Sequence, residues 1–449
     1  MKIVTTRRTF LKSAAAGAGT VVIGPYVSSQ NASPNDAVHL ASIGVGGRGK
    51  DDLHGVSGQK NVTVVALCDV DQGRLADQAK QFTSAKTFDD YRKMFDTMEK
   101  DIDAVTVGTP DHHHAPASMM AMHHDKHCYT EKPLTHSIYE ARKMAEMAAS
   151  KPKLATQMGN QGHCTHGVRA VVELVKQDVV GPIREVVGWT NRPVWPQGLD
   201  RPPAKEVPAG LNWDVWLGPA PERPYHDNLH PFAWRGWWDF GTGALGDMAC
   251  HILDGAIWSL DLRDPTSVET EGAPVKPECG PNWETIRMEF PARGKFPPCK
   301  FTWYDGKKTL DGKEVPNKPP ADLFEGEGVG GGGTLLIGEK GKIYINHEYC
   351  ETYKLLPKGQ WKDFMAPPPT TPDVAGNSPH ADFVDAIRNG RTGASHYGYS
   401  GPMTETILIG VVAFRVGKKL SWDAKNMKAI GCPEADPFIN RPYRKGWTL

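Results

Sequence analysis

The sequence predicts an α/β domain built on a doubly wound parallel sheet, followed by an α+β domain. Strand-like and helix-like segments alternate from Val38 to about Gln157, which is typical of a parallel sheet with helical crossovers. A glycine-rich turn follows the first of these strands. After Gly159, short strands follow one another, and several are separated by turns that contain Gly or Pro. This pattern favours an antiparallel or mixed sheet. A chain of 449 residues is also long enough for at least two domains.

The first domain is expected over 36–158. Its predicted strands cover 38–43, 62–68, 102–107, 127–130 and 154–157, and its predicted helices cover 73–82, 115–124 and 138–150. In such a sheet, ligands bind at the carboxyl ends of the strands. The loops that follow these strands are therefore the first candidates for a functional site.

The second domain is expected over 159–449. Its predicted strands cover 183–189, 285–290, 300–304, 334–337, 342–345 and 352–356, and its predicted helices cover 168–176, 241–260 and 402–418. The last helix is long and apolar, and we expect it to pack back on the first domain.

Residues 1–33 are expected to be an export signal with its linker. Arg7 and Arg8 form a twin-arginine pair, and the Ala- and Gly-rich run 13–24 is too short to span a bilayer. We interpret this segment as a Tat signal, which predicts a periplasmic or otherwise exported protein that is carried in folded form. The alternative is a cytosolic protein with a chance Arg-Arg pair.

Composition excludes several classes of function. Lys and Arg total 52, as do Asp and Glu, so the chain has no basic field for nucleic acid. No apolar run is long enough for a membrane span. The eight cysteines are dispersed without a CxxC pair, which predicts free, mostly buried thiols. The histidines at 112–114, 123–124, 163 and 166 lack the spacing of a zinc site, and we predict no metal.

The turn Gly44–Gly49 stands between a strand and a helix, which is the context that a dinucleotide-binding motif requires. Gly44 permits the tight turn, Gly46 lets the backbone approach a pyrophosphate, and Gly49 lets the helix pack close to the strand. The helix N-terminus then faces the anion.

The next strand ends at Asp69, which has roughly the spacing of the acid that binds the ribose 2′-hydroxyl. Asp69 and Asp71 would repel a 2′-phosphate, so we expect NAD(H) rather than NADP(H). Arg48 and Arg74 are the counterargument, because a nearby arginine can accept that phosphate. The alternative role of Asp69 is to cap the following turn.

Two further segments carry candidate chemistry. Lys132 lies in a turn just after a short strand, where a lysine can touch both a cofactor ring and a substrate hydroxyl; the alternative is a surface lysine. Asp247 and His251 are four residues apart and share one face of a helix. A histidine beside a carboxylate is a plausible acid or base, whereas the alternative is a capping aspartate and a structural histidine.

Together these segments resemble the glucose–fructose oxidoreductase/inositol dehydrogenase/rhizopine-catabolism (Gfo/Idh/MocA) superfamily. The motifs that carry the resemblance are Gly44-x-Gly46-x-x-Gly49, Thr109-Pro110-x-x-x-His114, Glu131-Lys132-Pro133 and Asp247-x-x-x-His251, in this order. The resemblance covers nearly the whole chain after the signal and implies a Rossmann domain followed by a domain with a large, open, mostly antiparallel sheet. It also implies a homodimer or homotetramer. One departure is Ala249, where members often have glycine.

The resemblance implies catalytic roles for Lys132, Asp247 and His251 in hydride transfer on sugars and cyclitols. Together with the glycine-rich turn, it gives a cofactor-binding set of Gly44, Gly46, Gly47, Arg48, Gly49, Asp69, Thr109, Pro110, His114, Glu131 and Lys132. Because the superfamily also contains NAD-dependent glycosidases, isomerases and reductases, the fold does not fix the reaction.

The segment 189–238 holds seven of the chain's thirteen tryptophans. Indole faces can stack on sugar rings, although large aromatic side chains more often simply pack an irregular segment into a core. The predicted substrate-binding residues are Trp234, Trp237, Trp238, Asp254 and His163.

The function predicted from the sequence is an exported NAD(H)-dependent oxidoreductase, with the cofactor held tightly, that acts on a sugar, cyclitol or glycoside. His251 would accept the hydroxyl proton, Asp247 would orient His251 or hold a neighbouring hydroxyl, and Lys132 would polarise the oxygen. The first alternative is a glycoside-cleaving enzyme that uses transient oxidation by retained NAD. A second is a non-catalytic sugar-binding protein on the same scaffold.

Overall fold

The computed structural model describes residues 37–366 and 368–449, so the predicted export signal lies outside the described residues. Residues Val38–Leu449 form one compact unit. None of the described helices is both long enough and apolar enough to cross a membrane.

The first part of this unit is a six-stranded parallel sheet in the order β3-β2-β1-β4-β5-β6. Its strands are β1 (Val38–Ile43), β2 (Val62–Cys68), β3 (Lys86–Phe88), β4 (Ala104–Val107), β5 (His127–Thr130) and β6 (Thr156–Met158). Its helices are α2 (Arg48–Ser57), α3 (Gln72–Ala79), α4 (Tyr91–Met98), α5 (Asp111–His123) and α6 (Ile138–Ser150). The strand order reverses between β1 and β4, and a crevice for ligands opens at the carboxyl ends of strands at such a point.

The second part contains a ten-stranded sheet in the order β14-β13-β12-β7-β10-β9-β8-β15-β16, with β11 paired to β10. Its strands are β7 (Ile183–Thr190), β8 (Ser267–Gly272), β9 (Trp283–Phe290), β10 (Cys299–Leu310), β11 (Lys313–Pro316), β12 (Gly332–Gly338), β13 (Lys342–Ile345), β14 (Tyr353–Leu356), β15 (Leu420–Asp423) and β16 (Lys428–Ala429). β7 pairs with β10 in parallel, and the other pairs are antiparallel. The predicted fold class is therefore confirmed.

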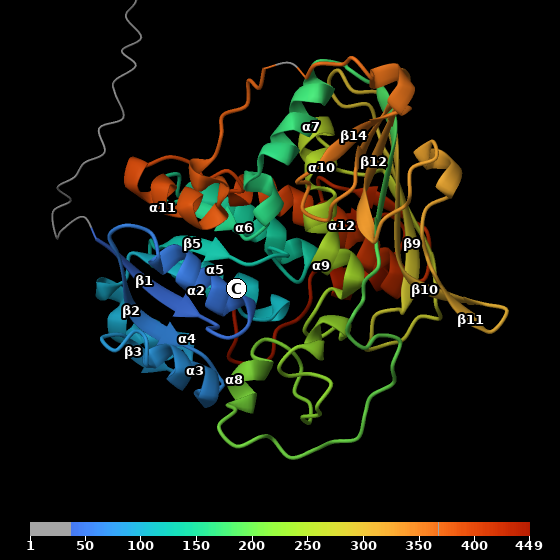
Figure 1. Cartoon of the computed structure of the whole chain (residues 1–449). Coiled ribbons are helices and arrows are strands. Elements are labelled where there is room, and N and C mark those ends of the chain that lie inside the picture. Colours follow the sequence, from blue (N-terminus) through green and yellow to red (C-terminus); the bar gives the residue numbers. More distant parts are fainter. Residues whose placement is uncertain (1–36, 367) are drawn as a thin grey trace, which may run out of the picture. The chain divides into compact units, whose positions relative to one another are not determined.

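Helices cover one face of the large sheet (Figure 1). The helices of this part are α7 (His166–Lys176), α8 (Trp213–Leu217), α9 (Gly243–Ile252), α10 (Asp254–Leu260), α11 (Pro379–Asn389), α12 (Tyr397–Val416) and α13 (Asp436–Ile439). The helix predicted over 241–260 is divided into α9 and α10 at Leu253. Asp254, the first residue of α10, is fully buried and directs its carboxylate to His163, so the break orients a side chain inward.

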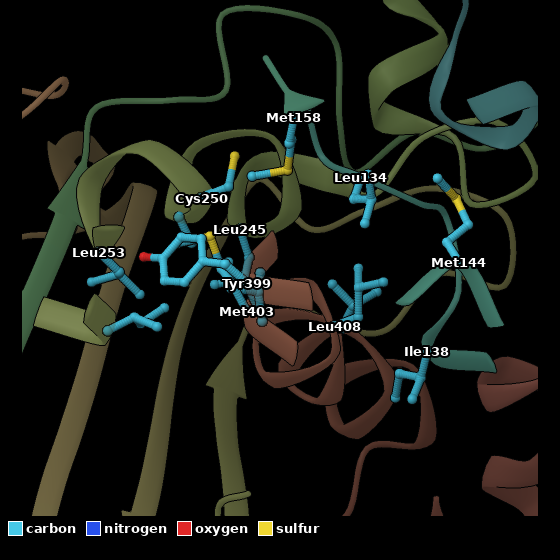
Figure 2. Packing of buried hydrophobic residues seen from close by; sticks show 14 of the residues in the cluster. Leu134, Ile138, Met144, Met158, Leu245, Cys250, Leu253, Tyr399, Met403 and Leu408 are labelled. Atoms are coloured by element: carbon cyan, nitrogen blue, oxygen red, sulfur yellow. The ribbon is translucent and has the colours of Figure 1, made fainter. Parts of the chain in front are cut away.

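Helix α12 packs against α6 of the first sheet and α9 of the second part. Gly401 makes the close approach to α6 possible, because a Cβ at that position would lie 2.9 Å from the Cβ of Ala145. Figure 2 shows the apolar side chains that meet there: Leu134, Ile138, Met144, Met158, Leu245, Cys250, Leu253, Tyr399, Met403 and Leu408.

The sequence prediction missed helix α4, although its pattern was present. Asp90 caps the helix by accepting a hydrogen bond from the Arg92 backbone N–H (2.9 Å). The buried residues Tyr91, Met94, Phe95 and Met98 then recur at the spacing of one helix face. The prediction of free thiols is confirmed, since all eight cysteines are unpaired and buried.

Candidate active site

A cavity of about 510 Å³ opens at the carboxyl ends of β1, β2, β4 and β5. Its other walls come from α9, from Tyr349 and from the irregular segment 191–240, which we call the insert. The volume lies within the range of small-molecule and cofactor sites. All predicted catalytic residues (Lys132, Asp247 and His251) line it, as do the predicted cofactor residues other than Gly49 and His114.

The glycine-rich turn has the geometry of a dinucleotide cradle. Gly44 has a φ of +77°, and a Cβ on it would lie 2.8 Å from the carbonyl carbon of Gly108. A Cβ on Gly49 would lie 1.9 Å from the carbonyl oxygen of Gly44, so α2 begins directly against the turn. The N-terminus of α2 therefore lies beside the cavity, where its N–H groups favour an anion.

Asp69 is fixed by the backbone. Its carboxylate accepts hydrogen bonds from the N–H groups of Val45 (2.8 Å) and Asp71 (2.9 Å), and the residue lines the cavity. Burial raises the pKa of Asp69, and these two hydrogen bonds oppose that shift. Arg74 also lines the cavity and lies against Gly46. It is therefore placed to accept a 2′-phosphate, and the counterargument to the predicted preference for NAD(H) stands.

Lys132 enters the cavity from the end of β5. Its ammonium donates to the carboxylate Oδ1 (3.0 Å) and the backbone carbonyl (3.1 Å) of Asp247. Burial would lower the pKa of Lys132, but the Asp247 carboxylate opposes burial and raises the pKa to about 12. The side chain is therefore a cation at neutral pH, and the third N–H of the ammonium is left for a ligand.

The closest partner of the Asp247 carboxylate is Lys132. Burial alone would raise the pKa of Asp247. Lys132 and then Arg235 (Nε to Oδ1 3.5 Å) act in the opposite direction and outweigh burial, so the pKa is lowered and the carboxylate is ionised. Within the described part of the chain, Nδ1 of His251 has no hydrogen-bond partner. The described structure shows no hydrogen bond between Asp247 and Nδ1 of His251, and the orienting role of Asp247 stays a prediction.

His251 is buried beside the Lys132 cation and the ring of Tyr349. Burial and then the Lys132 cation lower the pKa of His251 well below its usual value, so the imidazole is neutral at pH 7. The ring of Tyr349 contacts it edge-on, with 4.8 Å between ring centroids. A neutral imidazole that lines the cavity can accept a proton.

Two predicted cofactor residues, His114 behind the cavity wall and Glu131 within it, hold neighbouring parts of the site in place. The His114 ring lies between the carbonyls of Pro133 (2.7 Å from Nδ1) and Thr109 (2.9 Å from Nε2) and so contacts two loops that face the cavity. Burial lowers the pKa of His114, and the neutral ring donates to one of the two carbonyls. Glu131 accepts from Arg48 Nε (3.0 Å) and holds that arginine beside the glycine-rich turn.

The predicted substrate residues separate into two groups. Trp234 lines the cavity, whereas Trp237 and Trp238 are buried elsewhere: Trp237 packs with apolar residues of the insert and Trp238 against Arg415. His163 and Asp254 also lie outside the cavity wall. They form a buried pair (2.9 Å) that is joined by the hydroxyl of Tyr399.

Several lining residues were not predicted as site residues. They are Asp111, Gln161, Arg192, Trp195, Trp216, Phe232, Arg235 and Tyr349. Asp111 accepts from the Thr242 hydroxyl (2.9 Å), and burial together with the nearby Asp247 carboxylate raises its pKa to about 7. Most of the others come from irregular segments, where no periodic pattern indicates which side chains face inward. Within 37–366 and 368–449, no three His, Cys, Asp or Glu side chains are placed to hold a metal ion.

Comparison with known proteins shows similarity to NAD-dependent enzymes and to glycosidases. A glycosyl hydrolase family 109 protein of Shewanella sp. (strain W3-18-1) is 26% identical over 204 residues, which cover 39% of this chain and 44% of that protein. A protein of the same description from Solibacter usitatus is 27% identical over 196 residues, covering 40% and 44%. The chain thus spans less than half the length of these curated relatives.

Solved structures share the fold at lower identity. The WlbA dehydrogenase of Chromobacterium violaceum, in complex with NADH and UDP-GlcNAcA, has a TM-score of 0.60 at 16% identity, covering 90% of this chain and 99% of that one. Levoglucosan dehydrogenase in complex with NADH has a TM-score of 0.56 at 16% identity, covering 85% and 98%.

Two family models match the chain in succession. Residues 38–159 match the NAD-binding Rossmann fold of the oxidoreductase family, and residues 165–296 match its C-terminal alpha/beta domain. Since these models together cover more than half of the 449 residues, the chain belongs to the Gfo/Idh/MocA oxidoreductase family.

Proposed function

We propose that the protein is an exported oxidoreductase that uses tightly bound NAD(H) and acts on a hydroxyl-bearing carbon of a sugar, cyclitol or glycoside. The observation that carries this proposal is the Lys132–Asp247 pair (3.0 Å), which lies with His251 in the cavity that the glycine-rich turn enters. The close backbone approach at Gly44 and Gly49, together with the fixed carboxylate of Asp69, fits a dinucleotide.

The side chains divide the chemistry between them. When bound, the nicotinamide supplies the hydride acceptor. Lys132 donates its remaining N–H to the substrate oxygen and stabilises alkoxide character on it. His251, neutral beside the cation, accepts the hydroxyl proton. Asp247 holds Lys132 in place and keeps it charged.

Cofactor retention is supported by the way in which the insert attaches to the first sheet. Gln72 N–H donates to the carbonyl of Gly210 (2.9 Å), and the side-chain amide of Asn212 donates to Asp89 (2.8 Å). Nε2 of His230 lies 3.6 Å from the Asp71 carboxylate. These contacts lie around the end of β2, next to Asp69, so departure of a dinucleotide would require part of the insert to detach.

A second candidate is a glycoside-cleaving enzyme that uses transient oxidation. It is favoured by the similarity to glycosyl hydrolase family 109 proteins, which covers 39% of this chain. A non-catalytic sugar-binding protein is the weakest reading, because it gives no role to the charged Lys132 next to a neutral His251.

The test of the proposed function begins with the purified full-length protein. Denaturation should release a nicotinamide cofactor in close to equimolar amount, identified by mass spectrometry. Addition of sugars and glycosides to the native protein should change the absorbance of the bound nicotinamide. A protein that carries no nicotinamide cofactor, and binds none when NAD is supplied, would refute the proposal.

Cofactor preference is a separate prediction. Because the fixed Asp69 carboxylate would repel a 2′-phosphate, apo-protein should bind NAD(H) more than about tenfold more tightly than NADP(H), which corresponds to about 1.4 kcal/mol. Calorimetric titration of both cofactors checks this. Asp69→Asn should reduce the preference, and Arg74→Gln should not. Equal or tighter binding of NADP(H) by the wild type would contradict this prediction and would indicate that Arg48 or Arg74 binds the 2′-phosphate.

Export can be tested on residues that lie outside the described part of the chain. Replacing Arg7 and Arg8 with lysine should leave the folded protein intact but retain it in the cytoplasm, because a receptor recognises the arginine pair. Cell fractionation and immunoblotting measure the distribution. Replacing the nearby Lys12 with arginine is the control and should not alter export. Unchanged export of the double-lysine variant would contradict the Tat interpretation.

A further inference from the structure

The part of the cavity next to Lys132 and His251 contains two arginines, Arg192 and Arg235, that the proposed mechanism does not use. Both arginines belong to the insert. Arg192 is close enough to help lower the pKa of His251, after the larger effects of burial and Lys132. Arg235 lies 3.5 Å from the Asp247 carboxylate. The two cations therefore flank the predicted reaction centre.

Arg235 is held rigidly by aromatic rings. Its guanidinium carbon lies 4.3 Å from the ring centre of Trp234 and 4.7 Å from that of Phe232. Nη1 donates to the carbonyl of Phe232 (3.0 Å). The cation therefore occupies a face of Trp234, and this tryptophan positions Arg235 instead of offering that face to a sugar ring.

Arg192 has unused hydrogen-bonding capacity. The Arg192 side chain lines the cavity and is 29% exposed, and its Nη2 lies 3.8 Å from Oε2 of Glu348, beyond hydrogen-bond distance. The terminal N–H groups of this guanidinium therefore remain available to a ligand that supplies a hydrogen-bond acceptor.

The charges on this side of the cavity do not balance. Lys132, Arg192 and Arg235 are three cations, whereas Asp247 and Glu348 are the two carboxylates that contact them. Asp111, with a pKa raised to about 7, contributes only part of a negative charge. A pyrophosphate at the glycine-rich turn would face Arg48 and Arg74 instead. The balance is therefore positive by less than one full charge, which favours an anionic ligand of low charge.

We infer that the substrate is a sugar that carries a carboxylate, such as a uronic acid, bound by the guanidinium groups of Arg192 and Arg235. This inference rests on the proposed function for its choice of a sugar. A carboxylate matches the planar fork of arginine, and its single charge is closer to the small positive excess of the cavity than the charge of a dianion. A sugar phosphate, with nearly two charges, fits the same groups less well.

The experiment measures binding rather than turnover. Full-length protein with its own cofactor is titrated calorimetrically with D-glucuronate, D-galacturonate and D-mannuronate. The comparison ligands are the matching neutral hexoses, D-glucuronamide and D-glucose 6-phosphate. At least one hexuronate should bind more than about tenfold more tightly than its neutral counterpart, and increasing salt should weaken its binding. Repeating the titration with Lys132→Met separates binding from hydride transfer.

Variants assign this preference to the two arginines. Arg192→Gln and Arg235→Gln should each reduce hexuronate binding about tenfold more than they reduce neutral-sugar binding. Arg235→Lys keeps the charge but loses the fork, and it provides a second test if Arg235→Gln does not fold. Arg184→Gln is the matched control, because Arg184 is exposed and paired with Glu339 on the large sheet (2.8 Å).

Three results would overturn the inference: no measurable hexuronate binding, equal binding of the amide or neutral sugar, or a preference that survives both arginine substitutions. Tighter binding of glucose 6-phosphate would also overturn the choice of a carboxylate. Arginine-dependent hexuronate binding to a protein that transfers no hydride would refute the proposed function but leave this inference standing.

Discussion

Replacing Lys132 with methionine is expected to lower kcat by roughly a hundredfold or more, equivalent to about 2.7 kcal/mol of transition-state stabilisation. Methionine preserves much of the length and volume of the side chain but removes the charge that faces the substrate oxygen. Cofactor binding should change little, since the glycine-rich turn and Asp69 are untouched. Turnover with the best sugar, together with the cofactor content of the purified variant, measures both effects.

The control for this variant concerns Asp247, which would lose its closest cationic partner. Leaving one member of a buried ion pair costs about 3–5 kcal/mol of stability, so Lys132→Met alone will also unfold more easily. The double variant Lys132→Met with Asp247→Asn removes both charges and should recover stability but not activity. Recovery of turnover by the double variant would show that Lys132 has only a structural role.

Turnover without added cofactor is the second large expected effect. The proposed export would leave the enzyme without a supply of free NAD(H), so the proposed bound cofactor would have to be regenerated within each cycle. The protein as purified should therefore act on its substrate repeatedly, with no accumulation of NADH. Either a second substrate takes the hydride, or the same substrate takes it back after cleavage or epimerisation. The assay combines product analysis by chromatography with the absorbance of reduced nicotinamide.

The products distinguish the two enzymatic candidates. Glycoside cleavage without net NADH would favour the glycosidase. Because a transient ketone acidifies the neighbouring C–H bond, cleavage in heavy water should then leave deuterium in the sugar product. A free sugar oxidised while a second carbonyl compound is reduced would favour the oxidoreductase. Stoichiometric NADH that forms only when free NAD is supplied would contradict cofactor retention in either case.

The sequence allowed prediction of those parts of the site that depend on local chain geometry. Gly44 and Gly49 must be glycines because the backbone of the turn passes so close to Gly108 and α2. Lys132 follows directly after a strand, and strand ends in a doubly wound sheet meet at one edge. Asp247 and His251 share a helix face because they are one turn apart. Each of these inferences needs only a few neighbouring residues.

The remaining site residues depend on contacts between distant segments. Tyr349 follows β13 in a loop without a motif, yet it contacts His251 nearly a hundred positions earlier. In the insert, neither a helical nor a strand period separates inward from outward side chains, so Trp237 and Trp234 could not be told apart. His163 and Asp254 were predicted to bind the substrate, but neither lines the cavity. Their mutual pairing, which removes them from the cavity, required the three-dimensional structure.

Because α12 packs against α6, we expect that the chain cannot be divided between the segments matched by the two family models into fragments that fold separately. A fragment that ends at Gly159 would present the apolar face of α6 to water, and one that begins at His166 would leave α12 without its neighbour. Fragments produced separately should aggregate, whereas fragments produced together should associate through the close contact between Gly401 and Ala145. We therefore expect the two parts to behave as halves of a split protein, and exchanging the second one between family members would require the matching α6 surface to be exchanged with it.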